Sequence, residues 1–242
     1  MLTTVAQSSA RLPPRYQQQW GAEFWGFVNR SLHDRITILD IGAGRRPTIS
    51  PEQRPAGSHY VGLDITPGEL DAAPAGSYDE TFVADAQSLE PALVGRCELI
   101  VAWQVLEHIQ DLDSAADAFH LYATAGGSFV ACLSGRNAVF ALANRLLPAN
   151  LSRHLVAHLM HRPVETVFPA HYDRCNETGL HRAFSGWEEV QVIPLWRGAD
   201  YFARLPRLRP LYVRYEDWAI KRGSTNLATH YVVAARKGER PA

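Results

Sequence analysis

Lysine and cysteine are scarce in this 242-residue sequence. The cysteines at Cys97, Cys132 and Cys175 are odd in number and far apart, which argues against a disulfide framework or a zinc site. We expect them to be small buried side chains in a reducing cytosol. Lys221 and Lys237 are the only lysines among 24 basic residues, and we infer no function from this ratio.

Long apolar runs are also missing. Because no stretch of 18 apolar residues occurs, the sequence predicts no integral membrane segment. Residues 1–15 lack the basic-then-apolar order of a signal peptide. The formal net charge of −1 argues against extended binding to nucleic acid. We therefore expect a soluble cytoplasmic protein whose oligomeric state the sequence leaves open.

Short apolar strands, by contrast, recur along the chain. An apolar content of 46% is enough for the core of one large domain. Amphipathic spacing predicts helices over 16–34 and 113–123. The predicted strands are 36–41, 60–64, 81–85, 99–103, 127–133, 187–196 and 226–235. This alternation predicts a parallel, doubly wound α/β sheet.

The domain divides into four parts along the sequence: an N-terminal arm and helix (1–35), a core (36–133), a helical insertion (134–186) and C-terminal strands (187–242). Within the insertion, apolar spacing predicts two helices over 137–161, split at a proline. We expect these helices to form a lid over the active site, because they carry too few basic residues for a helix lying on a membrane.

A glycine turn and several acidic residues follow the first three predicted strands. Asp40, Gly42 and Gly44 end the first strand, Asp64 ends the second and Asp85 ends the third. In a parallel sheet these positions meet at one edge, where ligands bind. Acidic side chains there can accept hydrogen bonds from ribose hydroxyls and from an adenine amine, so the pattern predicts an adenosine pocket.

A nicotinamide dinucleotide also contains adenosine, but two features argue against it. The glycine turn lacks the third glycine of the G-x-G-x-x-G pattern. Pro47, Pro51 and Pro55 leave little room for the helix whose N-terminus would hold the pyrophosphate. A nicotinamide-dependent oxidoreductase is therefore an alternative that we do not favour.

Four motifs together resemble the class I S-adenosylmethionine-dependent methyltransferases. They are ILDIGAG at 38–44, GLD at 62–64, ADA at 84–86 and WQVLEHI at 103–109. The resemblance covers about 36–133 strongly. It implies S-adenosyl-L-methionine as the cofactor. It also implies a doubly wound, seven-stranded, Rossmann-like sheet, with the last strand lying antiparallel between the fifth and sixth strands.

The resemblance also implies roles for the residues after the first strand. Gly42 and Gly44 would approach the methionine part of the cofactor, and Asp40 would order the glycine loop. Arg45 and Arg46 fall in the proline-rich connection, where the family usually has a helix. They would either bind the methionine carboxylate or simply be solvated.

The same resemblance assigns the later loops. Asp64 would bind the ribose hydroxyls, Asp85 the adenine amine, and the Ala86 backbone a ring nitrogen. Gln104 would lie along the cofactor, and His108 would close the pocket. Asp85 and His108 have a plainer alternative role, which is to cap the helices that follow them.

Candidates for catalysis and for metal binding lie in the insertion. In the run FPAHYDR at 168–174 we select His171 as general base and Tyr172 as the residue that positions the acceptor, the alternative being a packed loop pair. His154, His158 and His161 share helical spacing, but we interpret them as one semi-polar helix face. No metal is expected.

Arginine and aromatic side chains alternate in 197–222, which we predict to be irregular. This pattern is compatible with an acidic partner, a nucleotide-sugar phosphate or a membrane surface. We favour a surface excursion whose aromatic side chains pack on the sheet.

The sequence thus predicts a methyltransferase that acts on a small-molecule or glycan acceptor, first of all at oxygen. A non-catalytic scaffold with the same fold is the second hypothesis. An RNA methyltransferase is a weaker one, because the charge is near neutral and no RNA-binding module is appended.

Overall fold

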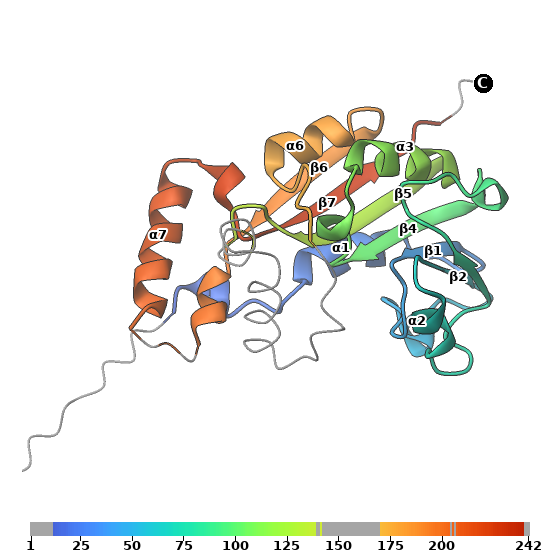
Figure 1. Cartoon of the computed structure of the whole chain (residues 1–242), viewed down its shortest axis with the longest axis horizontal. Coiled ribbons are helices and arrows are strands. Elements are labelled where there is room, and N and C mark those ends of the chain that lie inside the picture. Colours follow the sequence, from blue (N-terminus) through green and yellow to red (C-terminus); the bar gives the residue numbers. More distant parts are fainter. Residues whose placement is uncertain (1–11, 139–140, 142–169, 204, 206, 240–242) are drawn as a thin grey trace, which may run out of the picture.

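The computed structural model describes residues 12–138, 141, 170–203, 205 and 207–239. Seven strands form one sheet in the order β3-β2-β1-β4-β5-β7-β6 (Figure 1). They are β1 (Thr37–Ile41), β2 (His59–Asp64), β3 (Glu80–Val83), β4 (Cys97–Trp103), β5 (Ala123–Ser134), β6 (Glu188–Leu195) and β7 (His230–Arg236). β7 pairs antiparallel with both β5 and β6, while the pairs among β1 to β5 are parallel. The predicted fold and the place of its last strand are confirmed.

Helices cover both faces of the sheet. α1 (Ala22–Ser31) lies on one face, and α3 (Leu112–Tyr122) and α6 (Glu177–Ala183) lie on the other (Figure 1). Because both faces are covered, the central strands are apolar on both sides. Phe24 of α1 is fully buried in one apolar cluster, and Phe129 of β5 stacks between Phe119 and Phe184 in the other, with ring centroids 5.4 and 4.8 Å away.

The first helix is shorter than the predicted 16–34. A 3₁₀ turn covers Pro14–Tyr16, and α1 begins only at Ala22. The break falls at Gly21, whose φ of +78° is a left-handed conformation that glycine adopts easily. A Cβ atom at this position would lie 2.6 Å from the Trp103 ring, so this glycine also lets the chain pass close to β4.

Two predictions concern the segment between β1 and β2 and the start of β5. The proline-rich segment between β1 and β2 contains a 3₁₀ turn, Pro51–Gln53, and no α-helix, as its prolines predict. The predicted fifth strand, 127–133, begins too late, because β5 already begins at Ala123, before Gly126 and Gly127. There the pairing with β4 shifts register, and Gly126 has a φ of +73°, so the two glycines lie in an irregularity inside the strand.

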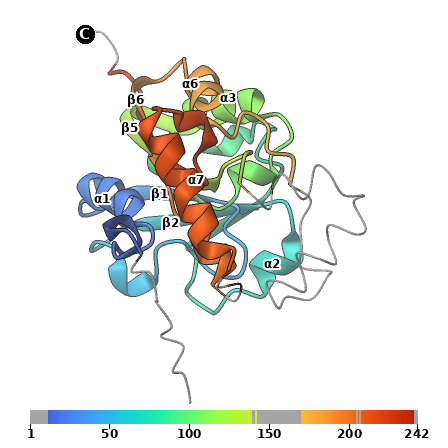
Figure 2. The ribbon, with the colours of Figure 1, turned by 90° about the vertical axis from the view of Figure 1, so that its left-hand side faces the viewer.

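The prediction of an irregular segment over 197–222 is also wrong. It contains a 3₁₀ helix, Gly198–Phe202, and the α-helix α7 (Arg209–Lys221), which stands at one end of the molecule (Figures 1 and 2). The sequence of α7 lacks the apolar periodicity that indicates a helix, because its buried face carries Glu216 and Ala219 instead of large apolar side chains.

The predicted helices over 137–161 fall almost wholly outside the described residues, as do His154, His158 and His161. α2 (Pro67–Asp71) completes the described α-helices. Among the helices of the described ranges, none is both long and apolar enough to cross a membrane.

Candidate functional site

The glycine turn after β1 is fixed by the ends of its neighbours. The backbone N–H groups of Gly42 and Ala43 donate to the Leu63 carbonyl oxygen at 2.7 and 3.1 Å. From the other side, the Tyr78 hydroxyl donates to the Ala43 carbonyl oxygen at 2.8 Å. Gly42 has a φ of +65°, and a Cβ atom there would lie 2.4 Å from a Val105 methyl group. This site therefore requires glycine at 42.

Asp40 lies beneath that turn and is fully buried. Its carboxylate accepts hydrogen bonds from the Thr48 N–H at 2.7 Å, the Thr48 hydroxyl at 2.8 Å and the Tyr60 hydroxyl at 2.8 Å. Burial raises the pKa of Asp40 to about 6, although these hydrogen bonds oppose the shift. Asp40 thus contacts the loop that follows the turn and does not reach the cavity described next.

A cavity of about 360 Å³ opens beyond the carboxyl ends of β1, β2 and β4. This volume lies within the range of about 300–1,000 Å³ that is typical of small-molecule sites. The lining residues come from the ends of β1, β2, β3 and β4 and from the segment before α6: Gly42, Leu63, Asp64, Ile65, Ala84, Asp85, Ala86, Gln87, Val105, His108, Ile109, Gln110 and His171. The cavity lies where strand order reverses between β1 and β4, which is the ligand crevice of a doubly wound sheet.

Asp64 forms the wall of this cavity next to the glycine turn. Its carboxylate accepts the N–H groups of Gly44 at 3.0 Å and Thr66 at 2.8 Å. Half-burial raises the pKa of Asp64, and those two hydrogen bonds oppose the rise. Because a carboxylate has more acceptor positions than these two donors use, it can also receive hydroxyl donors from the cavity.

Asp85, which follows β3, also lines the cavity and is held by Gln87. The Gln87 amide nitrogen donates to both carboxylate oxygens at 3.0 and 3.1 Å, and the Gln87 N–H donates at 3.0 Å. The Gln87 side-chain oxygen in turn accepts the N–H of Asp111, which caps α3. Gln87 therefore links the cavity to a helix, a role that the sequence reading missed.

His108 and His171 both line the cavity. The N–H groups of His171 and Tyr172 donate to the same acceptor, the Glu107 carbonyl oxygen, at 2.9 and 3.0 Å. The Tyr172 side chain is 8% exposed, packs in the apolar core and is not among the residues that line this cavity. Its backbone has a φ of +54°, so the chain turns sharply just after His171.

The remaining predicted site residues lie around the cavity rather than in its wall. Gly44 lies behind Asp64, and Arg45 pairs with Glu69 at 2.7 Å on the surface. Gln104 has a φ of +56° and points toward β5, where its side-chain oxygen accepts the Ser134 hydroxyl at 3.0 Å. Gln104 therefore contacts the strand next to the cavity.

Glu107 is a buried carboxyl group next to the site that the sequence reading did not select. One of its oxygens accepts the Ser134 N–H at 3.2 Å. The other has no hydrogen-bond partner among the described residues, and the side chain is 4% exposed. Burial raises the pKa of Glu107. An acidic residue within the apolar run after β4 was the only signal in the sequence.

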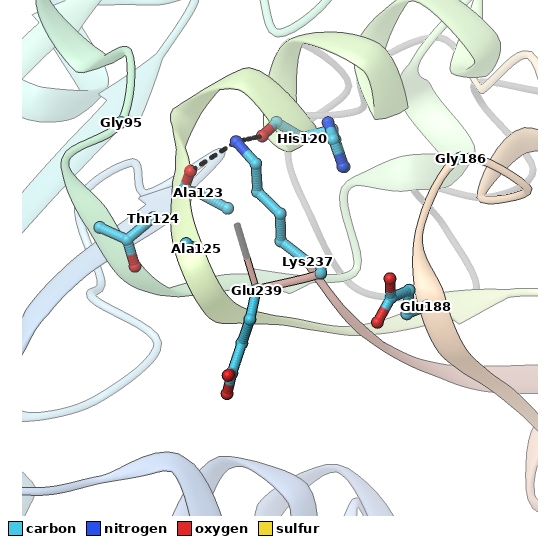
Figure 3. Close-up of a pocket in the computed structure, with 10 residues that line it drawn as sticks. Gly95, His120, Ala123, Thr124, Ala125, Gly186, Glu188, Lys237 and Glu239 are labelled. Atoms are coloured by element: carbon cyan, nitrogen blue, oxygen red, sulfur yellow. Dashed lines mark hydrogen bonds between the residues drawn. The ribbon is translucent and has the colours of Figure 1, made fainter. Parts of the chain in front are cut away.

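A second cavity, of about 550 Å³, lies at the opposite edge of the sheet (Figure 3). It is bordered by Gly95 before β4 and Thr124 at the start of β5. The Lys237 ammonium there donates to the carbonyl oxygens of His120 and Ala123 at 2.7 and 2.8 Å. This cavity is larger, but it lies away from the strand ends that carry the glycine turn and the acidic residues. We therefore place the functional site in the smaller one.

No group of three or more metal-ligating side chains gathers anywhere in the described part of the chain.

The fold and the cavity define a class: a doubly wound sheet with an antiparallel last strand and a crevice where the strand order reverses. Residues 14–184 match the protein family described as "Methyltransferase domain". The chain therefore belongs to this family, which confirms the class I S-adenosylmethionine-dependent methyltransferase predicted from the sequence. No curated protein matches the chain in sequence.

Solved structures with the same fold differ in their chemistry. Phosphoethanolamine N-methyltransferase 2 of Haemonchus contortus is 13% identical, with a TM-score of 0.53 over 90% of this chain and 52% of that one. Geranyl diphosphate C-methyltransferase of Streptomyces coelicolor A3(2) is 13% identical, with a TM-score of 0.55 over 90% and 76%. The [4+2]-cyclase SpnF is 13% identical, with a TM-score of 0.55 over 90% and 80%. The chain spans about half the length of the nematode enzyme, and at this identity the likeness shows the fold alone.

Proposed function

We propose that this protein transfers the methyl group of S-adenosylmethionine to a hydroxyl oxygen of a small molecule or glycan. The observation that carries the proposal is that His171 lines the same cavity as Asp64 and Asp85. One cavity thus offers acceptors for a nucleoside together with an imidazole that can take a proton from a hydroxyl group.

In this proposal the two acidic residues hold the nucleoside. Asp64 accepts hydrogen bonds from the ribose hydroxyls, and Asp85 accepts one from the adenine amine, with the Ala86 N–H beside it. Gly42 exposes backbone to the methionine part, Gly44 and Asp40 keep the turn in shape, and His108 covers the opening. Gln104 lies along the cofactor, from its position beside β5.

The bound cofactor supplies an electrophilic methyl group on a sulfonium sulfur. The chain then has to align the acceptor oxygen with that methyl carbon and remove a proton. We assign proton removal to His171: as the oxygen–carbon bond would form and the carbon–sulfur bond break, with S-adenosylhomocysteine leaving, the hydroxyl proton would pass to the imidazole. Tyr172 contributes by fixing the backbone, since its buried ring and its N–H bond to Glu107 hold the turn that carries His171.

Calorimetric titration with S-adenosylhomocysteine, with NADH as control, tests the cofactor assignment. We expect micromolar binding of the first and none of the second. Failure of S-adenosylhomocysteine to bind would overturn the proposal.

The acceptor atom needs a separate assay. Incubation with S-adenosylmethionine and a panel of hydroxyl, amine and carbon acceptors, read by mass spectrometry, should give methyl ethers. His171→Ala should lower kcat about 10²–10⁴-fold with cofactor affinity retained. His181→Ala, an exposed histidine of α6 outside the cavity, is the matched control. A methylated amine or carbon would refute the oxygen assignment and leave the cofactor assignment intact.

The second candidate function is binding of the cofactor without transfer of its methyl group. The observation that favours it is the similarity in fold to a protein named a [4+2]-cyclase. Tight binding of S-adenosylhomocysteine, without consumption of S-adenosylmethionine by any acceptor class, would support this candidate.

A further inference from the structure

α7 carries an exposed face that the proposed function does not use. Five exposed residues lie on one side of this helix and its C-terminal cap, at spacing i, i+3, i+7, i+10 and i+11: Leu211, Arg214, Trp218, Lys221 and Arg222. We call this set the outer stripe. At 3.6 residues per turn these positions fall within about a third of the helix circumference. The stripe holds two apolar side chains and three cations, and no acidic residue.

The orientation of α7 is set by a carboxylate on its inner face. Glu216 is fully buried and accepts the Gly198 N–H at 2.8 Å and the Thr229 hydroxyl at 3.2 Å. It also accepts the Tyr16 hydroxyl. These contacts join the helix to three separate segments of the chain. These contacts fix the orientation of α7. The outer stripe therefore faces away from the protein on a firmly packed helix.

The large side chains of the stripe are unusually exposed. Leu211 is 60% exposed and Trp218 is 46% exposed. Just before the helix, Leu205 and Leu208 are 48% and 45% exposed, which extends the apolar surface. Trp218 stacks on Tyr215 and lies beneath the Arg222 guanidinium, whose carbon is 5.1 Å from the ring centroid. A cluster of this kind on a held helix is typical of an interaction surface.

The charges on α7 decide what kind of partner fits. Its acidic residues are used elsewhere: Glu216 is buried, and Asp217 pairs with Arg15 at 2.7 Å. Arg214, Lys221 and Arg222 make no ion pair with any residue in the described ranges. The stripe is therefore positive, although the whole chain has a formal net charge of −1.

We propose that the outer stripe of α7 docks the protein on an anionic lipid bilayer. Leucine and tryptophan side chains enter the headgroup region while arginine and lysine meet the lipid phosphates, which is how interfacial helices bind. A second copy of this chain fits less well, because a two-fold contact would place the same cations against each other. A nucleic acid would pair with the cations and leave Leu211 and the tryptophan face exposed to water.

The stripe lies at the edge of the sheet that also carries the cofactor cavity. α7 follows the carboxyl end of β6 and precedes the start of the antiparallel strand β7, so both connections emerge at that edge. Docking through α7 therefore brings this edge of the sheet close to the bilayer.

Vesicle co-sedimentation of the full chain tests the proposal, with phosphatidylcholine vesicles compared with vesicles containing 30% phosphatidylglycerol. We expect binding to the anionic vesicles alone, weakened by added salt. Because each cation near an anionic surface contributes about fivefold in partitioning, Arg214→Gln with Lys221→Gln should lower binding about 25-fold. Leu211→Ser should lower it at least fivefold.

Two control variants isolate the stripe. Ile220→Ser removes an apolar side chain that is 41% exposed but lies about 200° around the helix from Trp218. Arg182→Gln removes an exposed cation of α6. Both should bind vesicles as the wild type does, and every variant should keep its affinity for S-adenosylhomocysteine.

Three results would overturn the docking proposal. The first is an absence of binding to anionic vesicles. The second is an equal loss of binding in the control variants. The third is a wild-type dimer that Leu211→Ser converts to a monomer in light scattering while vesicles remain unbound, which would make the stripe an interface between two copies.

Discussion

Substitution of Gly42 by alanine tests the geometry of the cofactor turn most directly. A φ of +65° disfavours any side chain, by about 1–2 kcal/mol. In addition, the new Cβ atom would lie 2.4 and 2.8 Å from the two Val105 methyl groups. An overpacked contact of this kind costs about 1–3 kcal/mol. We therefore expect Gly42→Ala to lower the free energy of unfolding by about 2–5 kcal/mol.

Gly44→Ala is the matched control, because its glycine is two residues away and has a φ of +53°. A Cβ atom at Gly44 would meet no atom closer than 3.7 Å, so this variant bears only the cost of a side chain at a left-handed φ. The two variants should thus differ by about 1–3 kcal/mol in urea unfolding. Gly42→Ala should also weaken binding of S-adenosylhomocysteine, since Gly42 and Val105 both line the cavity.

A double-mutant cycle separates the two causes of the loss. Combining Gly42→Ala with Val105→Ala removes the methyl groups in contact, so the pair should recover about 1–3 kcal/mol relative to the sum of the single effects. Additive losses, or equal losses in Gly42→Ala and Gly44→Ala, would show that the Val105 contact does not determine the need for glycine.

Four further outcomes follow from the described contacts. Asp64→Ala should weaken S-adenosylhomocysteine binding by about 1–3 kcal/mol in calorimetry, as ribose hydrogen bonds are lost. Asp40 has a pKa of about 6, above its unfolded value, so its ionisation costs native stability as pH rises from 4 to 7; wild type should lose about 2 kcal/mol more over this interval than Asp40→Asn in urea unfolding. Because burial favours the protonated carboxyl group, Glu107→Gln should change the unfolding free energy at pH 7.5 by less than about 1 kcal/mol, whereas Glu107→Ala should cost about 1–3 kcal/mol by leaving the Ser134 N–H unpaired. Phe184→Ala should cost about 3–5 kcal/mol in the same measurement, because its fully buried ring stacks on Phe129.

Each of these expectations has a contradicting result. Unchanged affinity in Asp64→Ala would mean that the ribose lies elsewhere. Parallel pH profiles for wild type and Asp40→Asn would mean that Asp40 is ionised throughout. A large loss in Glu107→Gln would indicate a carboxylate that the fold needs in its charged form. A small loss in Phe184→Ala would show that the core collapses into the space.

The parts of the fold predicted from the sequence are those whose signal is local. A β-branched run followed by glycines indicates β1 and its turn, whatever surrounds it. α7 was missed because its inner face is specified by one buried carboxylate, Glu216, whose partners Tyr16, Gly198 and Thr229 are distant in sequence. The start of β5 was misplaced because glycines usually end strands, whereas here they lie in an irregularity within one.

The candidate site shows the same division. Asp64 and Asp85 were selected because acidic residues at strand ends converge in any parallel sheet, and both line the cavity. Gln87 and the buried carboxyl of Glu107 were not selected, because their significance lies in contacts across loops. A polar side chain reveals such a contact only when its partner is known. The functional roles of Asp64 and Asp85 stay predictions.

The place of β7 between β5 and β6 affects how the chain folds while it is being made. β6 ends at Leu195 and β7 begins at His230, so 34 residues, 196 to 229, must be synthesised before β6 has its neighbour. At about 5–20 residues per second, β6 stays unpaired for roughly 2–7 s. Unpaired strands readily join other chains. Glu188 and Glu189 begin β6, and Pro194 interrupts its backbone donors, so this strand carries its own protection against aggregation during the wait.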